Sequence, residues 1–223
     1  MGTVVVVGAG PLLGKSIARA FGRRGHAVAL VARRADALAA LAESLQAEGI
    51  RAAGFAADIT VPEQVARAFA SIRETFGAID ILEFSPTDWG KGTDKLTSAL
   101  ATTAESAQAD FALLVQGAIR CAREVVPAMV ERGSGSLFFT TGYSAIQPLA
   151  FITSLGIANA GLRNYAYCLS EELKDKGVYV GTVSINAHIV PGTDGDPDKI
   201  AQVYLDMQDR RDRVESVFGP HHH

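Results

Sequence analysis

Three glycines follow a short β-branched segment near the beginning of the chain. Residues 3–7 are followed by Gly8, Ala9, Gly10, Pro11, Leu12, Leu13 and Gly14. Glycines at this spacing let the backbone turn tightly and approach a pyrophosphate, whose charge the first amides of the next helix attract. A strand-to-helix turn without a ligand is the alternative. The position at the start of an alternating chain favours a dinucleotide-binding turn formed by Gly8, Gly10, Leu12, Leu13 and Gly14.

Two arginines stand where a dinucleotide fold distinguishes NAD from NADP. Arg33 and Arg34 directly follow the apolar segment 27–32, and no acidic residue is present there to accept the ribose hydroxyls of NAD. A guanidinium group can bind a 2′-phosphate through two parallel hydrogen bonds, and Lys15 offers a second cation near the turn. The alternative is that both arginines are solvated residues opening a helix. The sequence therefore predicts NADP(H) as the cofactor, with NAD(H) as the second choice.

The elements that would position these residues alternate along the chain. Apolar, β-branched runs predict strands at 3–7, 27–32, 51–56, 79–84, 136–140 and 178–185, with a short edge strand at 213–218. Helical segments are expected at 12–24, 35–48, 62–76, 103–132, 157–176 and 197–207. Such alternation predicts a Rossmann-like, doubly wound parallel sheet in a three-layer α/β/α arrangement. We expect a single domain over residues 1–220.

Local signals mark the expected helix ends. Glycine follows five predicted helices, at positions 25, 49, 77, 133 and 177. Pro62 begins another helix, and Thr60 precedes Glu63 by the spacing of a capping box. These signals support the helix assignments independently of the apolar periodicity.

Composition and charge restrict the classes of function. Hydrophobic residues make up 48% and charged residues 20% of the 223 positions, as in a folded globular chain. The formal net charge of −3 provides no basic excess for nucleic acid or an anionic membrane surface. We find no signal-peptide pattern and no apolar segment long enough to cross a bilayer. The expected partner is a small-molecule substrate, and no metal site is predicted.

The cysteines and the terminal histidines carry no catalytic signal. Cys121 and Cys168 lie in predicted helices outside any paired-cysteine motif. We expect buried free thiols in a reducing cytoplasm. The last three residues, His221 to His223, are interpreted as the start of a purification tag.

Over nearly its whole length the chain resembles the short-chain dehydrogenase/reductase family. The glycine turn, Arg33 and Arg34, and Asp58 with Ile59 after the third predicted strand fall where that family contacts its cofactor. The segments 79–82, 115–117, 126–127 and 135–141 match its fourth strand, its long fifth helix and the strand that leads to its catalytic serine. The resemblance implies an oxidoreductase that forms a homodimer or homotetramer through its two long helices, with Asp58 against the adenine.

The catalytic identities of the family are absent at the aligned positions. A family enzyme uses a tyrosine as acid or base, a lysine four residues later, an upstream serine and a helix asparagine. These positions fall here on Leu155, Asn159, Gly142 and Leu114, respectively. The segment after the fourth strand also differs, and Leu12 takes a turn position that is usually glycine. The resemblance thus supports the fold and the cofactor but assigns no catalytic group.

Two other residues could transfer a proton at the same edge of the predicted sheet. Tyr143 directly follows the fifth strand, and a phenol can protonate a carbonyl when a nearby cation activates it. His188 follows the sixth strand, near where family members bind the nicotinamide, and imidazoles exchange protons near neutral pH. The alternatives are a packed tyrosine and a polar surface histidine. Tyr143 and His188 are our candidate catalytic residues.

Glu83 interrupts the apolar pattern of the fourth predicted strand. We expect it to pair with an arginine, because an unpaired buried carboxylate is costly. The alternative is that Glu83 adds a carboxylate to the cleft, as Asp88 in the following loop also could. Trp89 could line the cleft or pack on the core.

Three functions fit these observations. The first is an NADP(H)-binding oxidoreductase with a non-standard catalytic site that acts on a carbonyl substrate. The second is a catalytically inactive cofactor-binding protein that serves as a sensor or scaffold. The third is a lyase or isomerase that uses the same cleft without redox chemistry. The family resemblance favours the first, whereas the four missing identities favour the other two.

Overall fold

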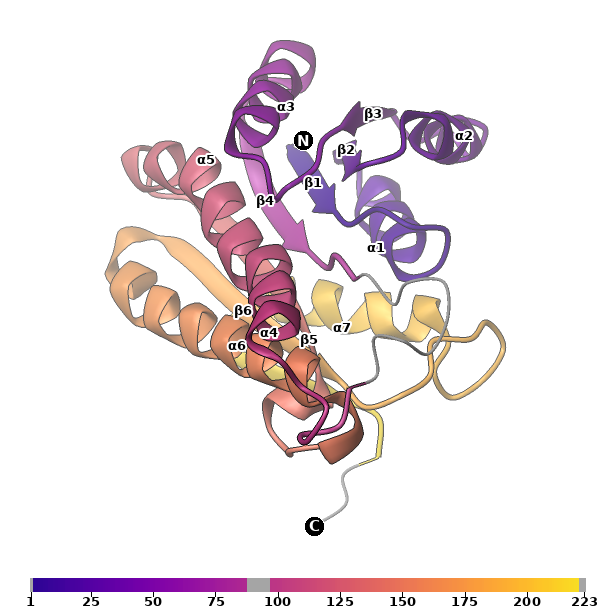
Figure 1. Ribbon diagram of the computed structural model, residues 1–223. Coiled ribbons are helices and arrows are strands. Elements are labelled where there is room, and N and C mark those ends of the chain that lie inside the picture. The colour runs from indigo at the N-terminus through magenta and orange to yellow at the C-terminus, as the bar shows by residue number, and fades with distance from the viewer. Residues whose placement is uncertain (1, 88–96, 221–223) are drawn as a thin grey trace.

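The computed structural model describes residues 2–87 and 97–220, and a parallel sheet of seven strands runs through it. The strand order is β3-β2-β1-β4-β5-β6-β7 (Figure 1). The strands are β1 (Thr3–Val7), β2 (Ala27–Ala32), β3 (Ala52–Ala56), β4 (Ile79–Phe84), β5 (Gly135–Gly142), β6 (Val178–Ile185) and β7 (Glu215–Phe218). The predicted doubly wound α/β fold is confirmed, with strand limits that differ from the expected ones by at most two residues.

Helices cover both faces of this sheet (Figure 1). One apolar core joins the sheet to α3 (Pro62–Phe76), α5 (Gly117–Glu131) and α6 (Thr153–Leu173). The other core joins it to α1 (Leu13–Arg23), α2 (Ala35–Gln46) and α7 (Pro197–Arg210). No helix in the described ranges is both long enough and apolar enough to span a bilayer.

Alternation of side chains along the central strands explains the two cores. In β1, Val5 and Val7 belong to one core, whereas Val4 and Val6 belong to the other, and all four are fully buried. Each buried valine contributes on the order of 1.5 kcal/mol or more. This burial holds the end of β1, and the glycine turn that follows it, in a fixed position.

The long helix expected at 103–132 is interrupted. A helix α4 (Ala104–Phe111) is followed by a π-helical turn at Ala112–Gln116, and α5 begins at Gly117. Gly117 packs so closely that a Cβ there would lie 2.9 Å from Cδ1 of Ile59. Apolar periodicity does not distinguish a π turn from an α turn, and such turns often occur near functional sites.

Two local expectations were wrong. Val61, not Thr60, is the N-cap of α3, because the Thr60 hydroxyl donates to Asp58 Oδ1 at 2.7 Å instead of capping the helix. Cys121 is buried, which raises its pKa to about 12, but Cys168 is exposed. Position 168 is two residues beyond the buried Ala166 and therefore lies on the opposite side of α6.

Candidate functional site

The candidate residues gather along the carboxyl edge of the sheet because all strands run parallel. The glycine turn follows β1, Arg33 follows β2 and Asp58 follows β3. Tyr143 and His188 follow the neighbouring strands β5 and β6, where Gly142 pairs with Ile185. The strand order reverses between β1 and β4, and ligands of open α/β sheets bind at such a switch point.

The glycine turn requires glycine at position 8. Gly8 has a φ of 89°, and its N–H donates to the Val31 carbonyl at 2.8 Å. A Cβ there would lie 2.5 Å from the backbone of Pro86, so no side chain fits. At Gly10, in contrast, the nearest atom to an added Cβ is 3.8 Å away. The turn is thus packed against the Ser85–Pro86 backbone at Gly8 and open at Gly10, where a phosphate would approach.

The start of α1 is accessible in spite of Leu12. Leu12 is 42% exposed and serves as the N-cap position, whereas Leu13 is buried in the core. The amides of Leu13 and Gly14 donate to no acceptor within the described residues. A helix start with available amides and a positive dipole end suits an anion. The start of α1 therefore offers two available amides beside an exposed leucine.

Arg33 and Asp58 stand on adjacent strands at the adenosine end of the site. Arg33 and Arg34 are exposed directly after β2. Asp58 Oδ1 accepts hydrogen bonds from the N–H and the hydroxyl of Thr60, at 2.9 Å and 2.7 Å. These bonds, together with the charge of Arg33, lower the pKa of Asp58, so it stays ionised at neutral pH. Ile59 is buried beside it.

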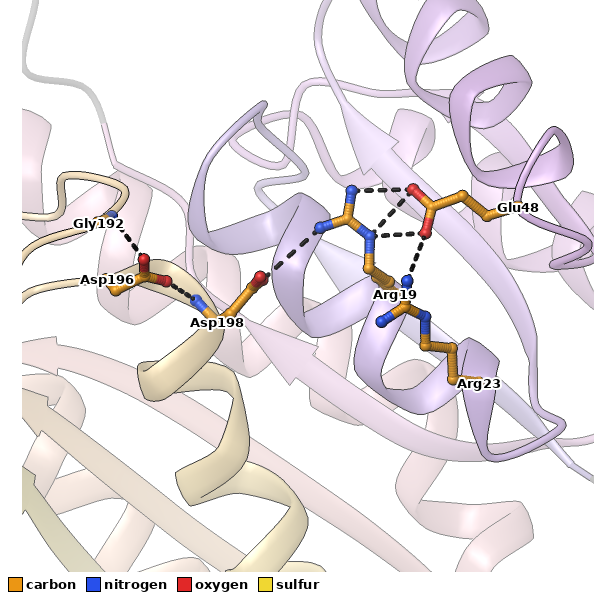
Figure 2. A network of polar contacts seen from close by, with 6 residues as sticks. All are labelled: Arg19, Arg23, Glu48, Gly192, Asp196 and Asp198. Carbon is orange, nitrogen blue, oxygen red and sulfur yellow. Dashed lines mark hydrogen bonds and ion pairs between the residues drawn. The ribbon is translucent and has the colours of Figure 1, made fainter.

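An ion-pair network anchors the loop that carries His188 (Figure 2). Arg19 of α1 binds Glu48 through two nitrogens and lies 3.6 Å from Asp198 at the start of α7. Asp196 accepts from the N–H groups of Gly192 and Asp198 at 2.6 Å and 2.8 Å. The loop between β6 and α7 is thereby tied to α1. The His188 side chain itself is exposed and forms no hydrogen bond with the described residues.

The turn after β5 contains a serine hydroxyl that no sequence pattern indicated. The Gly142 N–H donates to Asn159 Oδ1 at 3.3 Å, and Asn159 Nδ2 donates to Ser144 Oγ at 3.2 Å. Because Ser144 Oγ accepts this bond, its own proton is available to another acceptor. A Cβ at Gly142 would lie 3.5 Å from Ser144 Oγ. The turn after β5 brings the Ser144 hydroxyl beside Gly142. Sequence spacing does not reveal this turn and therefore did not indicate Ser144 as a site residue.

Tyr143 lies between these two residues in a short 3-10 turn. Its carbonyl accepts hydrogen bonds from the amides of Ile146 and Gln147, both at 2.9 Å, which fix the turn. The side chain is partly buried and makes no hydrogen bond with the described residues. Its phenol is therefore available to a ligand at this edge.

A polar chain on the α6 side braces the same edge. Thr141 and Ser184 share a hydrogen bond of 2.8 Å, and Ser184 donates to Glu215 Oε1 at 2.9 Å. Arg163 of α6 binds both carboxylate oxygens of Glu215. The chain joins β5, β6 and β7, in agreement with a structural role for Thr141.

Glu83 has no arginine partner, and that expectation was wrong. Its side chain is fully buried on β4, where Oε1 accepts from the Thr140 hydroxyl at 2.9 Å and Oε2 from the Ser85 hydroxyl at 3.0 Å. Burial raises the pKa of Glu83 to about 8. The sheet registers Glu83 between Val6 and Phe138, so no basic side chain is beside it on the neighbouring strands. Asp88, Trp89 and the terminal histidines lie outside the described residues.

Comparisons with known proteins identify the family and agree with the fold. The sequence profile of the family described as short chain dehydrogenase matches residues 2–194. A short chain dehydrogenase of Pseudocercospora fijiensis is 26% identical over 88% of this chain, and the chain spans 62% of that relative's length.

Two solved structures share the fold. L-sorbose reductase from Gluconobacter frateurii, complexed with NADPH and L-sorbose, superposes with a TM-score of 0.84 at 25% identity, covering 96% of this chain and 94% of its own. An NADPH-bound short chain oxidoreductase from Pseudomonas aeruginosa PAO1, described as containing an atypical catalytic center, has a TM-score of 0.86 at 20% identity. That alignment covers 99% of this chain and 97% of the other.

Proposed function

Because the chain belongs to the short chain dehydrogenase family, we propose that it is an NADP(H)-binding oxidoreductase with a non-standard catalytic site. The observation that carries the proposal is the open glycine turn at the switch point, with Arg33 and the ionised Asp58 on the neighbouring strands. The NADPH complexes of the two structural neighbours support the same cofactor.

The residues of the turn fit a dinucleotide. The available amides of Leu13 and Gly14 would hold the pyrophosphate, Arg33 and Arg34 the 2′-phosphate, and Asp58 with Ile59 the adenine. The chemistry that NADPH would supply here is a hydride for a substrate carbonyl carbon. The substrate class that suits this chemistry is a small aldehyde or ketone.

Replacing Arg33 by alanine is expected to weaken NADPH binding by about 10- to 100-fold, since hydrogen bonds to charged groups contribute about 1.5–3 kcal/mol. NADH, which lacks the 2′-phosphate, should lose less than about threefold in affinity. Calorimetry on the purified protein measures both constants. Arg67→Ala removes an exposed arginine of α3 and serves as the matched control. Equal losses for the two cofactors would contradict the assignment of Arg33, and no binding of either would refute the proposed function.

On the protein side, we propose that Ser144 donates its available proton in a hydrogen bond to the substrate carbonyl oxygen, and that Tyr143 transfers a proton to that oxygen. Asn159 orients Ser144 through the hydrogen bond that its side-chain amide donates to Ser144 Oγ. His188 is the second candidate for the proton transfer, because its loop lies at the same edge.

If the protein reduces a carbonyl substrate, Tyr143→Phe is expected to lower kcat by about 100-fold with little change in KM, because it removes only the transferable proton. Steady-state NADPH oxidation measures this effect. His188→Gln is the comparison variant. A larger loss of kcat in His188→Gln than in Tyr143→Phe would assign the proton transfer to His188. Unchanged turnover in both variants would show that neither residue is the acid.

Ser144→Ala is expected to reduce kcat by about 10-fold or more, since one preorganised donor to a developing oxyanion is lost. Ser98→Ala, the same change at an exposed serine outside the turn after β5, is the control. If kcat is unchanged while NADPH still binds, the hydroxyl has no role in polarising a carbonyl.

One observation favours a second function, a cofactor-binding sensor or scaffold without hydride transfer. Asn159 occupies the position aligned with the family's lysine, and its amide is engaged with Gly142 and Ser144. An uncharged amide does not activate a phenol as an ammonium group does. NADPH binding without turnover of any aldehyde or ketone would support this function, and turnover without NADPH consumption would support a lyase or isomerase.

We further propose a homodimer or homotetramer in the reducing cytoplasm. Apolar side chains on α4, α6 and the segment before α6 are exposed, including Phe111, Phe151 and Ile157. Sedimentation equilibrium tests the oligomeric state.

A further inference from the structure

Glu83 connects two segments of the candidate site, the residues that follow β4 and the end of β5. Its Oε2 accepts from Ser85, the first residue after β4, and its Oε1 accepts from Thr140, two residues before Gly142. Tyr204 of α7 completes the cluster through a 2.6 Å contact between its hydroxyl and Thr140 Oγ1. The cluster therefore consists of one carboxyl and three hydroxyls.

The Ser85 segment supports the glycine turn directly. The Ser85 N–H donates to the Val7 carbonyl at 2.9 Å, and Gly8 is packed against the backbone of Ser85 and Pro86. Contacts thus connect Glu83 to Ser85 and the segment Ser85–Pro86 to the glycine turn.

The surroundings of Glu83 suit a neutral acid. Among the described residues, Val6 of β1 and Phe138 of β5 face it in register, and Tyr204 is the one titratable side chain turned toward it. On the same face of the sheet, Arg19 of α1 forms ion pairs with Glu48 and with Asp198 of α7 (Figure 2). Loss of the proton would place an uncompensated negative charge beneath a turn that must accept phosphates.

We propose that Glu83 is a positioning residue for the dinucleotide site, which holds Ser85 and Thr140 as a neutral carboxylic acid and weakens binding of the anionic cofactor when it loses its proton. This inference rests on the proposed NADP(H) binding. It assigns a function to a buried acid that the hydride-transfer scheme does not use.

The test is the pH dependence of NADPH affinity in the wild-type protein and in Glu83→Gln, a neutral isostere. Between pH 7 and pH 9.5 the wild-type dissociation constant is expected to rise about tenfold more than that of the variant. The reason is that a rise of about one unit in the pKa of Glu83 on NADPH binding corresponds to a tenfold change in affinity. Titrating groups shared by both proteins cancel in this comparison. Equal pH dependence would overturn the proposal, as would a loss of NADPH binding by the neutral variant at pH 7.

A second measurement needs only the wild-type protein, in case Glu83→Gln does not fold. Calorimetric titration with NADPH at pH 8 in buffers of different ionisation enthalpy should show net proton uptake, since a bound anion favours the protonated acid. No proton uptake at pH 8, with saturable binding at pH 6.5, would refute the role of Glu83 alone. No NADPH binding at any pH would refute the proposed function and this inference together.

Discussion

Replacing Glu83 by glutamine is expected to raise the free energy of unfolding at pH 7 by about 3 kcal/mol relative to the wild-type protein. The pKa of this fully buried carboxyl is raised from 4.5 to about 8. Its contribution to stability is therefore complete below about pH 4.5 and is lost as the pH rises toward 8, because the unfolded chain ionises first. Glutamine avoids this cost, because its Oε1 can accept from Thr140 and its Nε2 can donate to Ser85 Oγ once the Ser85 hydroxyl turns from donor to acceptor.

Chemical denaturation at pH 4.5 and pH 7 measures the effect. The two proteins should have similar stability at the lower pH and diverge at the higher one. Glu43→Gln, the same change at an exposed position of α2, is expected to alter stability by less than about 0.5 kcal/mol. Parallel pH profiles for wild type and Glu83→Gln would show that Glu83 does not fold as a neutral acid.

Replacing Gly8 by alanine is expected to destabilise the protein by about 2–5 kcal/mol and to abolish detectable NADPH binding. The φ of 89° is costly for alanine, and its Cβ would lie 2.5 Å from the Pro86 backbone, which cannot rotate away. The turn and the segment after β4 would have to separate. Thermal or chemical denaturation measures the first effect and calorimetry the second.

Gly10→Ala is the matched control for this variant. Its Cβ meets no atom closer than 3.8 Å, so stability should change by less than about 1 kcal/mol. NADPH binding should nevertheless fall by about tenfold or more, because the cofactor must approach the backbone at this glycine. Normal NADPH affinity in Gly10→Ala would place the phosphates elsewhere, and normal stability in Gly8→Ala would contradict the close packing of the turn.

Glu83 and the glycine turn together explain how this edge of the sheet is built. Gly8 and Pro86 allow β1 and β4 to end in close contact, and Ser85 connects that contact to the buried carboxyl. Among the described residues, Arg33 and Arg34 are exposed directly after β2, and Asp58 follows β3 at the same edge.

Local patterns in the sequence determined the fold and the position of the predicted cofactor-binding residues at the strand ends. Continuous β-branched runs specify strands covered on both faces, and β1, β2, β4 and β6 have the predicted limits. The glycine turn and Arg33 lie within a few residues of the strand ends that position them. Parallel strands place those ends at one edge, so their proximity follows from the alternation alone.

Tertiary packing alone decided the contacts of the proposed catalytic residues and the surroundings of the buried acid. Ser144 and Asn159 are separated by 15 positions, and only the packing of α6 against the end of β5 brings them within hydrogen-bond distance of each other. The hydrogen-bond partners of Glu83 are Ser85, directly after β4, and Thr140 of β5, which in turn contacts Tyr204 of α7. These hydroxyls take the place of the expected arginine, and a hydroxyl can also accept the proton of a neutral carboxyl. A group's protonation depends on every element packed around it, and a sequence pattern records only its neighbours along the chain.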